Sequence, residues 1–343
     1  MPMHNGWLPR EGFRSDSLGS LIKKTALNPA FTLIFLLLAR LVSNYLERGV
    51  QNNWVDDKYD WQKEIVLITG GAGGIGGQVV KLLAERGITV VVLDVVPMSY
   101  ETTSNVHYYK CDITSPSMIA TVASRIRSEV GNPTVLINNA GVARGKSILD
   151  STERDVQFLP HMIRNDHGMV VTVASLAAYL SVPNMTDYAS SKAAALSFHE
   201  GLTAELLTKY NAPKVRTIVI NQGYTKTALF QGYKNDSTFL LPALEVDTVA
   251  ESIVKKILKG KSGQGIFPGF GVSLTWLRAM PGWIQNRART NGQHAMSNWK
   301  GRQVLDVDRF YDEKEREEEE REEKSKEGKK VDGESESTIL VNP

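Results

Sequence analysis

Three side chains in the middle of the chain have the types and spacing for acid–base chemistry. Tyr188 and Lys192 are four residues apart, so a helix would place both on one face, and Ser175 ends an apolar run thirteen residues before the tyrosine. An ammonium group beside a phenol favours the phenolate, so we expect a lowered pKa for Tyr188. Ser175 could hydrogen-bond the same substrate oxygen. The pair alone is a weak signal, because most such pairs are ordinary neighbours on a helix surface.

A glycine-rich turn upstream gives these side chains a context. It follows the short apolar run 64–68, a predicted strand, and precedes a predicted helix over 78–87. Glycines have no Cβ, so their backbone can approach a pyrophosphate, and the helix N-terminus supplies positive charge. A plain glycine loop is the simpler alternative. The predicted dinucleotide-binding residues of this turn are Thr69, Gly70, Gly74, Ile75 and Gly76.

An acidic residue, Asp94, ends the second predicted strand, eighteen residues after Gly76. A carboxylate at that place accepts hydrogen bonds from an adenosine ribose and repels a 2′-phosphate. The sequence therefore predicts NAD as the preferred cofactor, with NADP as the alternative. The simpler interpretation of Asp94 is a strand end that faces solvent.

With these motifs in order, the chain resembles the short-chain dehydrogenase/reductase family over about residues 60–270. Residues 69–76 are similar to the family's T-G-x-x-x-G-x-G, and residues 138–141 match its N-N-A-G. The sequence around Ser175 and Tyr188 is most similar to the membrane-associated branch that includes 17-beta-hydroxysteroid and retinol/retinal dehydrogenases. The resemblance implies an α/β Rossmann fold with a doubly wound parallel sheet. It also implies an NAD(P)-dependent oxidoreductase that interconverts an alcohol and a carbonyl on a retinoid, a steroid or a long-chain lipid.

The resemblance assigns a role to each matching residue. Ser175, Tyr188 and Lys192 are the expected catalytic residues: Tyr188 donates the proton, Lys192 holds the ribose and tunes Tyr188, and Ser175 fixes the carbonyl oxygen. Asp112 matches the acidic residue near the adenine. The remaining cofactor contacts are expected from Asn138, Ala140, Gly141, Gly223, Thr225 and Thr227.

Two departures from the family pattern stand out. Gln222 replaces the proline of P-G-x-V-x-T. Only 26 residues separate Gly141 from Gly168, fewer than in family members. We predict that part of the helix after the N-N-A-G strand is missing, including the asparagine that completes the family's catalytic set. Residues 151–157 are typical of a helix start and 158–165 of a helix end.

The missing segment leaves two explanations and two functions open. A crossover of about a dozen residues can still join parallel strands, so the sheet should survive. We favour a skipped exon or a faulty gene model over a natural degenerate or redirected enzyme. The alternative function is a catalytically impaired, membrane-associated scaffold that binds a dinucleotide.

Composition limits the other classes of function. Cys111 is the only cysteine, so no intrachain disulfide can form, and an intracellular protein is the plainer expectation. The six histidines show no metal-ligand spacing, so we predict no metal, and no nucleic-acid motif is present. The resemblance leaves a homodimer open.

Two segments predict contact with a membrane or lipid-droplet surface, for example at the endoplasmic reticulum. The apolar run 30–39 is shorter than the roughly 20 residues that span a bilayer, so we expect an interfacial or re-entrant helix within 28–46. From Ser252 through Leu305 the chain has nine Lys or Arg and no acidic residue, interleaved with aromatics. A helix packed on the protein and a substrate lid are the respective alternatives. The predicted organisation is an N-terminal extension (1–55), the Rossmann domain (56–270), a basic-aromatic lid or membrane-contact segment (271–311) and a charged disordered tail (312–343).

Overall fold

The computed structural model describes residues 29–140, 158–227, 230 and 239–294. The chain divides into two compact units, Met1–Trp54 and Val55–Pro343. The predicted boundaries of the four segments 1–55, 56–270, 271–311 and 312–343 stay predictions.

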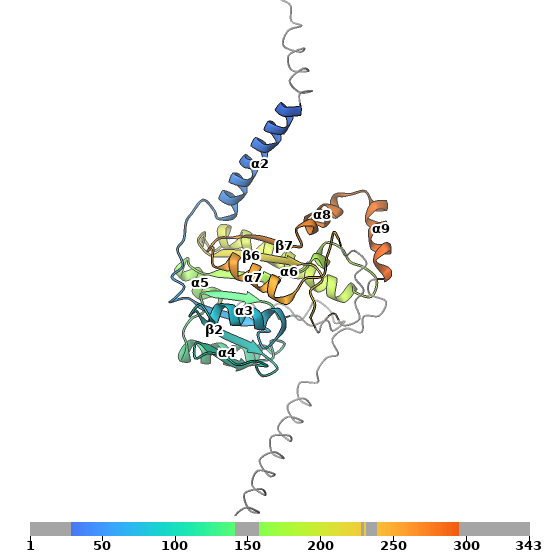
Figure 1. Ribbon diagram of the computed structural model, residues 1–343. Coiled ribbons are helices and arrows are strands. Elements are labelled where there is room, and N and C mark those ends of the chain that lie inside the picture. The colour runs from blue at the N-terminus through green and yellow to red at the C-terminus, as the bar shows by residue number, and fades with distance from the viewer. Residues whose placement is uncertain (1–28, 141–157, 228–229, 231–238, 295–343) are drawn as a thin grey trace, which may run out of the picture. The chain divides into compact units, whose positions relative to one another are not determined.

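The second unit is built on a seven-stranded sheet in which every neighbouring pair is parallel (Figure 1). The strand order is β3-β2-β1-β4-β5-β6-β7, so the direction of winding reverses between β1 and β4. The central strands are apolar and rich in β-branched residues, as expected where both faces are covered. This confirms the predicted doubly wound sheet. The strands are β1 (Ile65–Thr69), β2 (Thr89–Asp94), β3 (Val106–Lys110), β4 (Val135–Asn138), β5 (Met169–Val173), β6 (Arg216–Gln222) and β7 (Gly263–Phe267).

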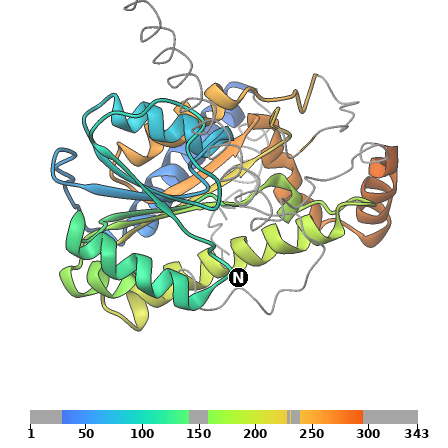
Figure 2. The same ribbon diagram turned by 90° about the horizontal axis from the view of Figure 1, so that it is seen from below.

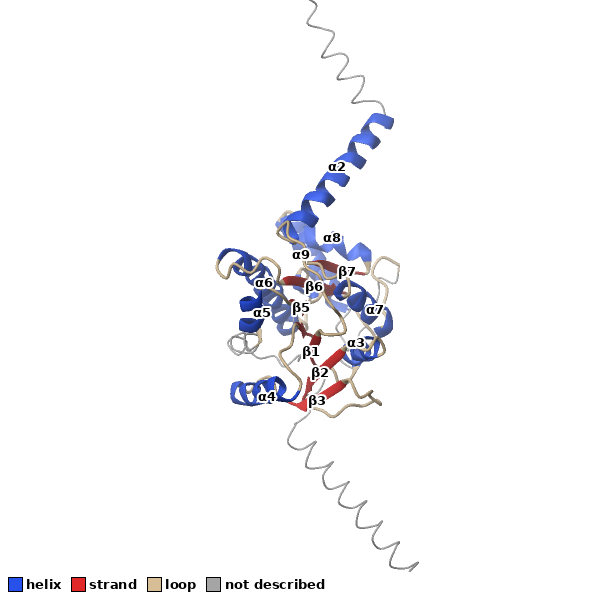
Figure 3. Ribbon diagram, turned by 90° about the vertical axis from the view of Figure 1, so that its left-hand side faces the viewer, coloured by secondary structure: helices blue, strands red, loops and turns tan. Residues whose placement is uncertain are grey.

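Helices cover both faces of the sheet, as Figures 2 and 3 show from two directions. On one face lie α3 (Gly74–Ala84) and α7 (Val246–Ile257), whose apolar side chains share one core. On the other lie α4 (Pro116–Glu129), α5 (Leu159–Asn165) and α6 (Thr186–Thr208), which share a second core. The remaining elements are the short turns and helices η2 (Leu176–Ala178), η4 (Gly269–Gly271), α8 (Val272–Thr275), η5 (Trp276–Ala279), α9 (Gly282–Asn291) and η6 (Gly292–His294).

Helix α5 is only seven residues long, although the strands on either side of it remain paired. Val135 of β4 lies opposite Met169 of β5, so the sheet survives the short connection, as predicted. Pro160 stands in the first turn, where its missing N–H costs nothing, and Asp166 ends the helix in a left-handed conformation with φ 44°. Residues 158–165 therefore contain a complete short helix with its own start, and not only the helix end that we predicted. The predicted start at 151–157 lies outside the described residues.

The first unit contains helix α2 (Pro29–Gln51), which is longer than the apolar run that predicted it. The run continues beyond Arg40 into an amphipathic half with Ser43, Glu47 and Gln51 on one side. Twenty-three residues rise about 35 Å, and the most apolar 18-residue window has a mean hydropathy of 1.6. By length and composition the whole helix could cross a membrane. The expectation of an interfacial or re-entrant helix considered only the apolar half of α2, and how the helix meets a membrane stays a prediction.

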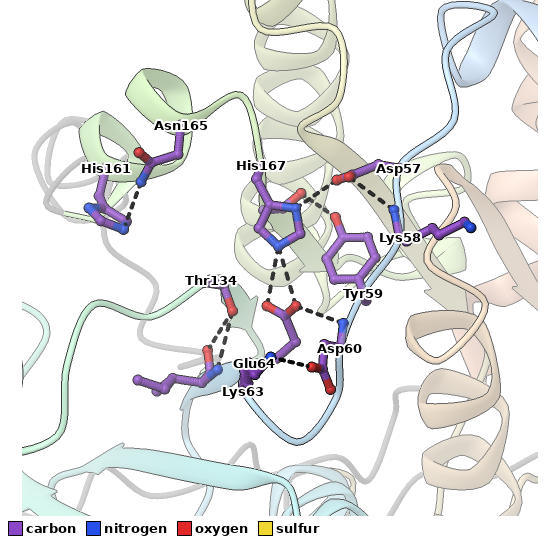
Figure 4. Close-up of polar contacts among 12 residues, drawn as sticks. Asp57, Lys58, Tyr59, Asp60, Lys63, Glu64, Thr134, His161, Asn165 and His167 are labelled. Atoms are coloured by element: carbon purple, nitrogen blue, oxygen red, sulfur yellow. Dashed lines mark hydrogen bonds and ion pairs between the residues drawn. The ribbon is translucent and has the colours of Figure 1, made fainter.

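At the amino edge of the sheet, the segment 55–64, which we call the strap, is held by charged side chains (Figure 4). Nδ1 of His167 lies 2.7 Å from a carboxylate oxygen of Asp57, and Nε2 lies 3.3 Å from both carboxylate oxygens of Glu64. Glu64 is buried and the other two side chains are mostly covered. Both ring nitrogens of His167 therefore face a carboxylate of the strap.

Backbone contacts complete the attachment of the strap. The hydroxyl of Tyr59 donates to the carbonyl of Gly168 at 2.6 Å, and the tyrosine ring stacks on Trp61 with centroids 5.2 Å apart. Arg216, fully buried at the start of β6, donates from Nη2 to the carbonyl of Val55 at 2.6 Å. The strap is therefore tied to residues that follow it by more than a hundred positions.

Candidate active site

The glycine-rich turn connects β1 to α3 at the carboxyl edge of the sheet, where the sequence predicted it. Gly74, the first residue of α3, has φ +58°, a conformation that other residues rarely adopt. A Cβ on Gly76 would stand 2.2 Å from the carbonyl oxygen of Gly70, so only glycine fits there. Ile75 packs against the core below. Such a turn lets a ligand such as a pyrophosphate approach the backbone close to the helix N-terminus.

The end of β4 is bonded directly to this turn. The hydroxyl oxygen of Thr69 accepts hydrogen bonds from the N–H groups of Asn139 (3.2 Å) and Ala140 (3.0 Å). The side-chain amide of Asn139 donates to the carbonyls of Thr69 (3.1 Å) and Gly70 (2.9 Å). Asn139, which holds the turn, was not among the residues that the sequence singled out, and the cofactor contact of Asn138 stays a prediction. Asn138 ends β4, and Gly141 lies outside the described residues.

Asp94 ends β2 with its carboxylate directed at the glycine turn. One oxygen accepts from the N–H of Ala72 at 2.9 Å, and the other accepts from Val95 at 2.8 Å. Asp94 is therefore a half-buried neighbour of the turn and not a strand end that faces solvent. Oδ1 also accepts from the N–H of Val96 at 3.3 Å, whereas Oδ2 keeps a second lone pair that can accept from a ribose hydroxyl.

Asp112 lies just beyond β3, in the turn that leads to α4. Its carboxylate accepts from the N–H of Thr114 at 2.7 Å, and its carbonyl accepts from Ser115 at 3.0 Å. In this structure the residue shapes the local turn, and the contact with an adenine stays a prediction.

Ser175 and Tyr188 are buried close to each other, from η2 and α6. The Ser175 hydroxyl accepts from the N–H of Ala177 and donates to the carbonyl of Gln222, both at 3.2 Å. Burial raises the pKa of Tyr188 to about 12, although its hydrogen bond with Ser175 acts in the opposite direction. The predicted lowering of this pKa was wrong, because removal of the phenol from water outweighs the neighbouring polar groups.

Lys192 lies one helical turn after Tyr188, on the same face of α6, as the spacing predicted. Its ammonium donates to the carbonyl of Val173 at 2.7 Å and stands 5.7 Å from the centroid of the tyrosine ring. Burial lowers the pKa of Lys192 to about 8. The ammonium is bonded to the strand and not to the phenol, which is why it does not offset the burial of Tyr188.

The segment after β6 keeps an ordered turn although Gln222 replaces proline. Gly223 donates from its N–H to the carbonyl of Phe267 at 2.6 Å. Thr225 is buried, donates from its hydroxyl to Gly223 at 3.3 Å and bridges to Leu244. Thr227 donates from its N–H to the carbonyl of Thr225 at 2.8 Å. Neighbouring strands and side chains therefore hold the loop without the fixed ring of proline.

Aromatic rings stand beside the buried phenol. Phe230 meets Tyr188 edge to face, with centroids 5.5 Å apart, and meets Tyr224 at 5.8 Å. Val182 and Met185 belong to the same apolar cluster. Sequence reasoning missed Phe230, because no motif marks an aromatic residue that lies 42 positions after the tyrosine it contacts.

The C-terminal elements lie against the segment that links η2 to α6. Arg278 of η5 donates from its guanidinium to the carbonyl of Ala178 at 2.6 Å. Trp276 and Trp283 are 65% and 72% exposed, so the aromatic side chains of this region face outward. Both a lid and a membrane-contact role for this segment stay predictions. Within the described parts of the chain, no three His, Cys, Asp or Glu side chains are grouped as metal ligands.

Comparison with known proteins gives several matches. The family model for short chain dehydrogenases matches residues 64–158 and 156–238, two segments that adjoin just before α5. Dehydrogenase RED2 of Cochliobolus heterostrophus is 41% identical over 218 residues, which cover 58% of this chain and 82% of RED2. Human epidermal retinol dehydrogenase 2 is 31% identical over 253 residues (66% and 82%). Human 17-beta-hydroxysteroid dehydrogenase 13 is 31% identical over 256 residues (66% and 83%).

Solved structures agree on the fold. A short chain dehydrogenase from Burkholderia cenocepacia in complex with NADP superposes with a TM-score of 0.56 at 23% identity, covering 66% of this chain and 97% of that one. The 3-ketoacyl-(acyl-carrier-protein) reductase from Brucella melitensis complexed with NADH gives 0.53 at 21% identity (60% and 96%). At these identities the likeness shows the fold alone.

Proposed function

Because this chain belongs to the short-chain dehydrogenase family, we propose that it is an alcohol dehydrogenase or carbonyl reductase that acts on an apolar substrate at a membrane surface. Membership makes it an NAD(P)-dependent oxidoreductase. The observation that carries the proposal is the buried Ser175–Tyr188 pair with Lys192 on the same helix face. The aromatic cluster of Tyr188, Phe230 and Tyr224 supports an apolar substrate. Relatives named for retinol and for a hydroxysteroid support the same class.

In the direction of reduction, the chain's own residues supply the proton and bind the substrate oxygen. Tyr188 donates its phenolic proton to the carbonyl oxygen, and Ser175 would turn its hydroxyl from the carbonyl of Gln222 to donate a hydrogen bond to that oxygen. A pKa of about 12 keeps Tyr188 protonated at physiological pH, which suits a proton donor. Lys192 would turn its ammonium toward the ribose of the cofactor. A bound nicotinamide dinucleotide would supply the hydride.

The glycine turn fits such a cofactor, since a Cβ on Gly74, the first residue of α3, would meet no heavy atom within 4 Å, so a ligand has room to approach the backbone there. Asp94 supports a preference for NAD over NADP, because its carboxylate stands beside the turn and would face a 2′-phosphate. Thr69, Gly70, Gly74 and Ile75 of the turn would line the pyrophosphate. We assign the adenine side to Asp112 and the nicotinamide side to Asn138, Ala140, Gly141, Gly223, Thr225 and Thr227.

The decisive assay offers the full-length protein a panel of retinol, a hydroxysteroid and a long-chain alcohol with NAD or NADP, and the matching carbonyls with NADH or NADPH. We expect turnover of at least one apolar substrate, preferably with NAD(H). Turnover of small polar alcohols alone would contradict the substrate class. Tyr188→Phe serves as the inactive control.

Helix α2 and the basic-aromatic segment 267–302 would act as two membrane signals, one through its apolar surface and the other through its positive charge. The exposed Trp276 and Trp283 support this role. Deletion of residues 1–50 should move the protein into the soluble fraction, and high salt should release part of it by screening the basic segment. Equal partitioning of the shortened and full chains at low salt would contradict the membrane proposal. The endoplasmic reticulum and the lipid droplet are the proposed locations.

A second candidate function is a scaffold that binds the dinucleotide without turning over a substrate. The seven-residue α5 and the family match in two adjoining segments favour it. Dinucleotide binding without turnover of any substrate in the panel would establish the scaffold. Sequencing of the transcript across Gln157 and Phe158 would separate a skipped exon from a natural shortening.

A further inference from the structure

Four successive carbonyl groups of the glycine turn accept hydrogen bonds from side chains outside the turn. The amide of Asn139 covers the first two, those of Thr69 and Gly70. The carbonyl of Gly71 accepts from the hydroxyl of Tyr100 at 2.7 Å, and the carbonyl of Ala72 accepts from the hydroxyl of Ser99 at 2.8 Å. Asn139 follows β4, whereas Ser99 and Tyr100 lie in the connection after β2. The turn is thus held from both sides.

Each of these bonds fixes the orientation of a peptide plane. In a trans peptide, the N–H points away from the preceding C=O. The carbonyl of Gly71 faces Tyr100, so the N–H of Ala72 faces the opposite way, where Asp94 accepts it at 2.9 Å. By the same geometry, a carbonyl of Ala72 held by Ser99 turns the N–H of Gly73 away from Ser99. Gly73 and Gly74 form the exposed tip that leads into α3.

The ring of Tyr100 is closely packed in this position. A Cβ on Gly77 would stand 3.0 Å from a ring carbon of Tyr100, and the ammonium of Lys81 lies 4.7 Å from the ring centroid. Burial, together with the nearby Asp94 carboxylate, raises the pKa of Tyr100, so its hydroxyl remains a donor. Gly77 and Lys81 of α3 therefore hold the ring of Tyr100 in place beside the turn.

We propose that Ser99 and Tyr100 are positioning residues for the dinucleotide. Tyr100 holds the carbonyl of Gly71 away from the pyrophosphate and so leaves the N–H of Ala72 bonded to Asp94. Ser99 holds the carbonyl of Ala72 away from the pyrophosphate and so turns the N–H of Gly73 toward it. Carbonyl oxygens that faced the pyrophosphate would repel it, whereas N–H groups at a helix start attract it. The inference rests on the proposed function, because it names residues that serve the cofactor of that reaction.

Tyr100→Phe and Ser99→Ala test the proposal, with Tyr109→Phe as the matched control. Tyr109 lies two strands from β1, and its hydroxyl donates to Glu129 at 2.8 Å, so the control also loses one hydrogen bond. Dissociation constants for NADH, ADP and adenosine are measured on the full-length protein. Each site variant should bind NADH and ADP roughly three- to tenfold more weakly, as expected for the loss of one hydrogen bond. Adenosine, which lacks the pyrophosphate, should bind each variant as it binds the parent.

A second readout separates positioning from a general loss of structure. Each site variant should have a higher KM for the dinucleotide and a kcat close to that of the parent. Hydrogen exchange over residues 69–76 should be faster in the ligand-free variants than in the ligand-free parent. Unchanged NADH affinity in both variants would overturn the inference while leaving the proposed function intact. Equal losses for adenosine and ADP would overturn it as well, because they indicate a collapsed site. A parent protein that binds no dinucleotide would overturn the proposed function, and the inference with it.

Discussion

The two edges of the parallel sheet use polar side chains in different ways. At the amino edge, charged side chains meet one another, with His167 between Asp57 and Glu64. At the carboxyl edge, Asp94 and Lys192 meet backbone groups, an N–H and a carbonyl. The first arrangement joins segments that are 103 and 110 residues apart. The second leaves lone pairs and N–H groups that a ligand can still use.

With the proposed function, the comparison predicts that the amino edge stabilises the fold and the carboxyl edge serves the reaction. Asp57 and Glu64 have a side-chain partner in His167, whereas the ammonium of Lys192 is bonded to a neutral carbonyl and keeps its charge for another partner. Substitutions at the two edges should therefore separate unfolding free energy from turnover, and the following predictions test that separation from the largest expected effect to the smallest.

The largest effect is expected from Tyr188→Phe at the carboxyl edge. Loss of the proton donor should reduce turnover roughly 10²–10⁴-fold, equivalent to about 3–5 kcal/mol. Thermal unfolding should change little, because the ring and its contact with Phe230 remain. Steady-state rates and melting curves check both statements. Turnover near that of the parent would remove Tyr188 from the chemistry.

The opposite result, a loss of stability with turnover retained, is expected from His167→Ala at the amino edge. Without the imidazole, the buried Glu64 and the largely covered Asp57 lose their partner, at a cost of about 1–3 kcal/mol in unfolding free energy. The kcat should stay close to that of the parent. Chemical denaturation and turnover are measured together.

A matched control at the same edge is Lys63→Ala, which breaks the exposed ion pair with Asp60. It should alter the unfolding free energy much less than His167→Ala, since exposed pairs contribute little. If the two substitutions cost the same, the strap is not held by burial of its charged cluster.

Lys192 should make both turnover and stability depend on pH. With its pKa near 8, the ammonium loses its proton as the pH rises through that value, while Tyr188 stays protonated. If the charged form is required, kcat/KM for reduction should fall roughly tenfold per pH unit above about pH 8. Lys192→Arg keeps its charge and should remove that fall, whatever its absolute rate. A parent profile that is flat to pH 10 would contradict the role.

The same shift predicts how stability depends on pH. The pKa of Lys192 is lower in the folded protein than its ordinary 10.5, so the unfolded chain binds more protons between about pH 8 and 10.5. In that range Lys192 should make stability rise with pH. Comparison with Lys192→Met isolates this contribution, and parallel curves for the two proteins would contradict it.

The smallest effect is expected from Asp94→Ser. The change should narrow the ratio of NADH to NADPH affinity by about three- to tenfold, because the ribose loses a charged acceptor and the 2′-phosphate loses a repelling neighbour. Titration with both dinucleotides measures the ratio. Equal affinity of the parent protein for NADPH and NADH would show that Asp94 does not face the ribose.

The parts of the site that the sequence predicted well depend on local order along the chain. The strand, the glycine turn and the helix after Thr69 follow from apolar periodicity and missing Cβ atoms. The position of Asp94 at the end of β2 follows in the same way. Such features need only a few neighbouring residues.

The parts that it missed depend on where a side chain points after folding. The pKa of Tyr188 was predicted in the wrong direction because the ammonium of Lys192 bonds to Val173. Asn139 was not singled out as the amide that holds the turn, because the motif alone does not say which side chain faces it. Phe230 and the cluster at His167 join residues far apart in the sequence, and spacing carries no signal for them.

The strap also has a consequence for the order of events during synthesis. Val55 leaves the ribosome 161 residues before Arg216, its partner at the start of β6. At 5–20 residues per second, the delay is on the order of 10–30 s. Throughout that interval the nascent chain has no Arg216 to bind the beginning of the strap. Helix α2, which directly precedes the strap, can therefore meet a lipid surface while the catalytic domain is still being translated.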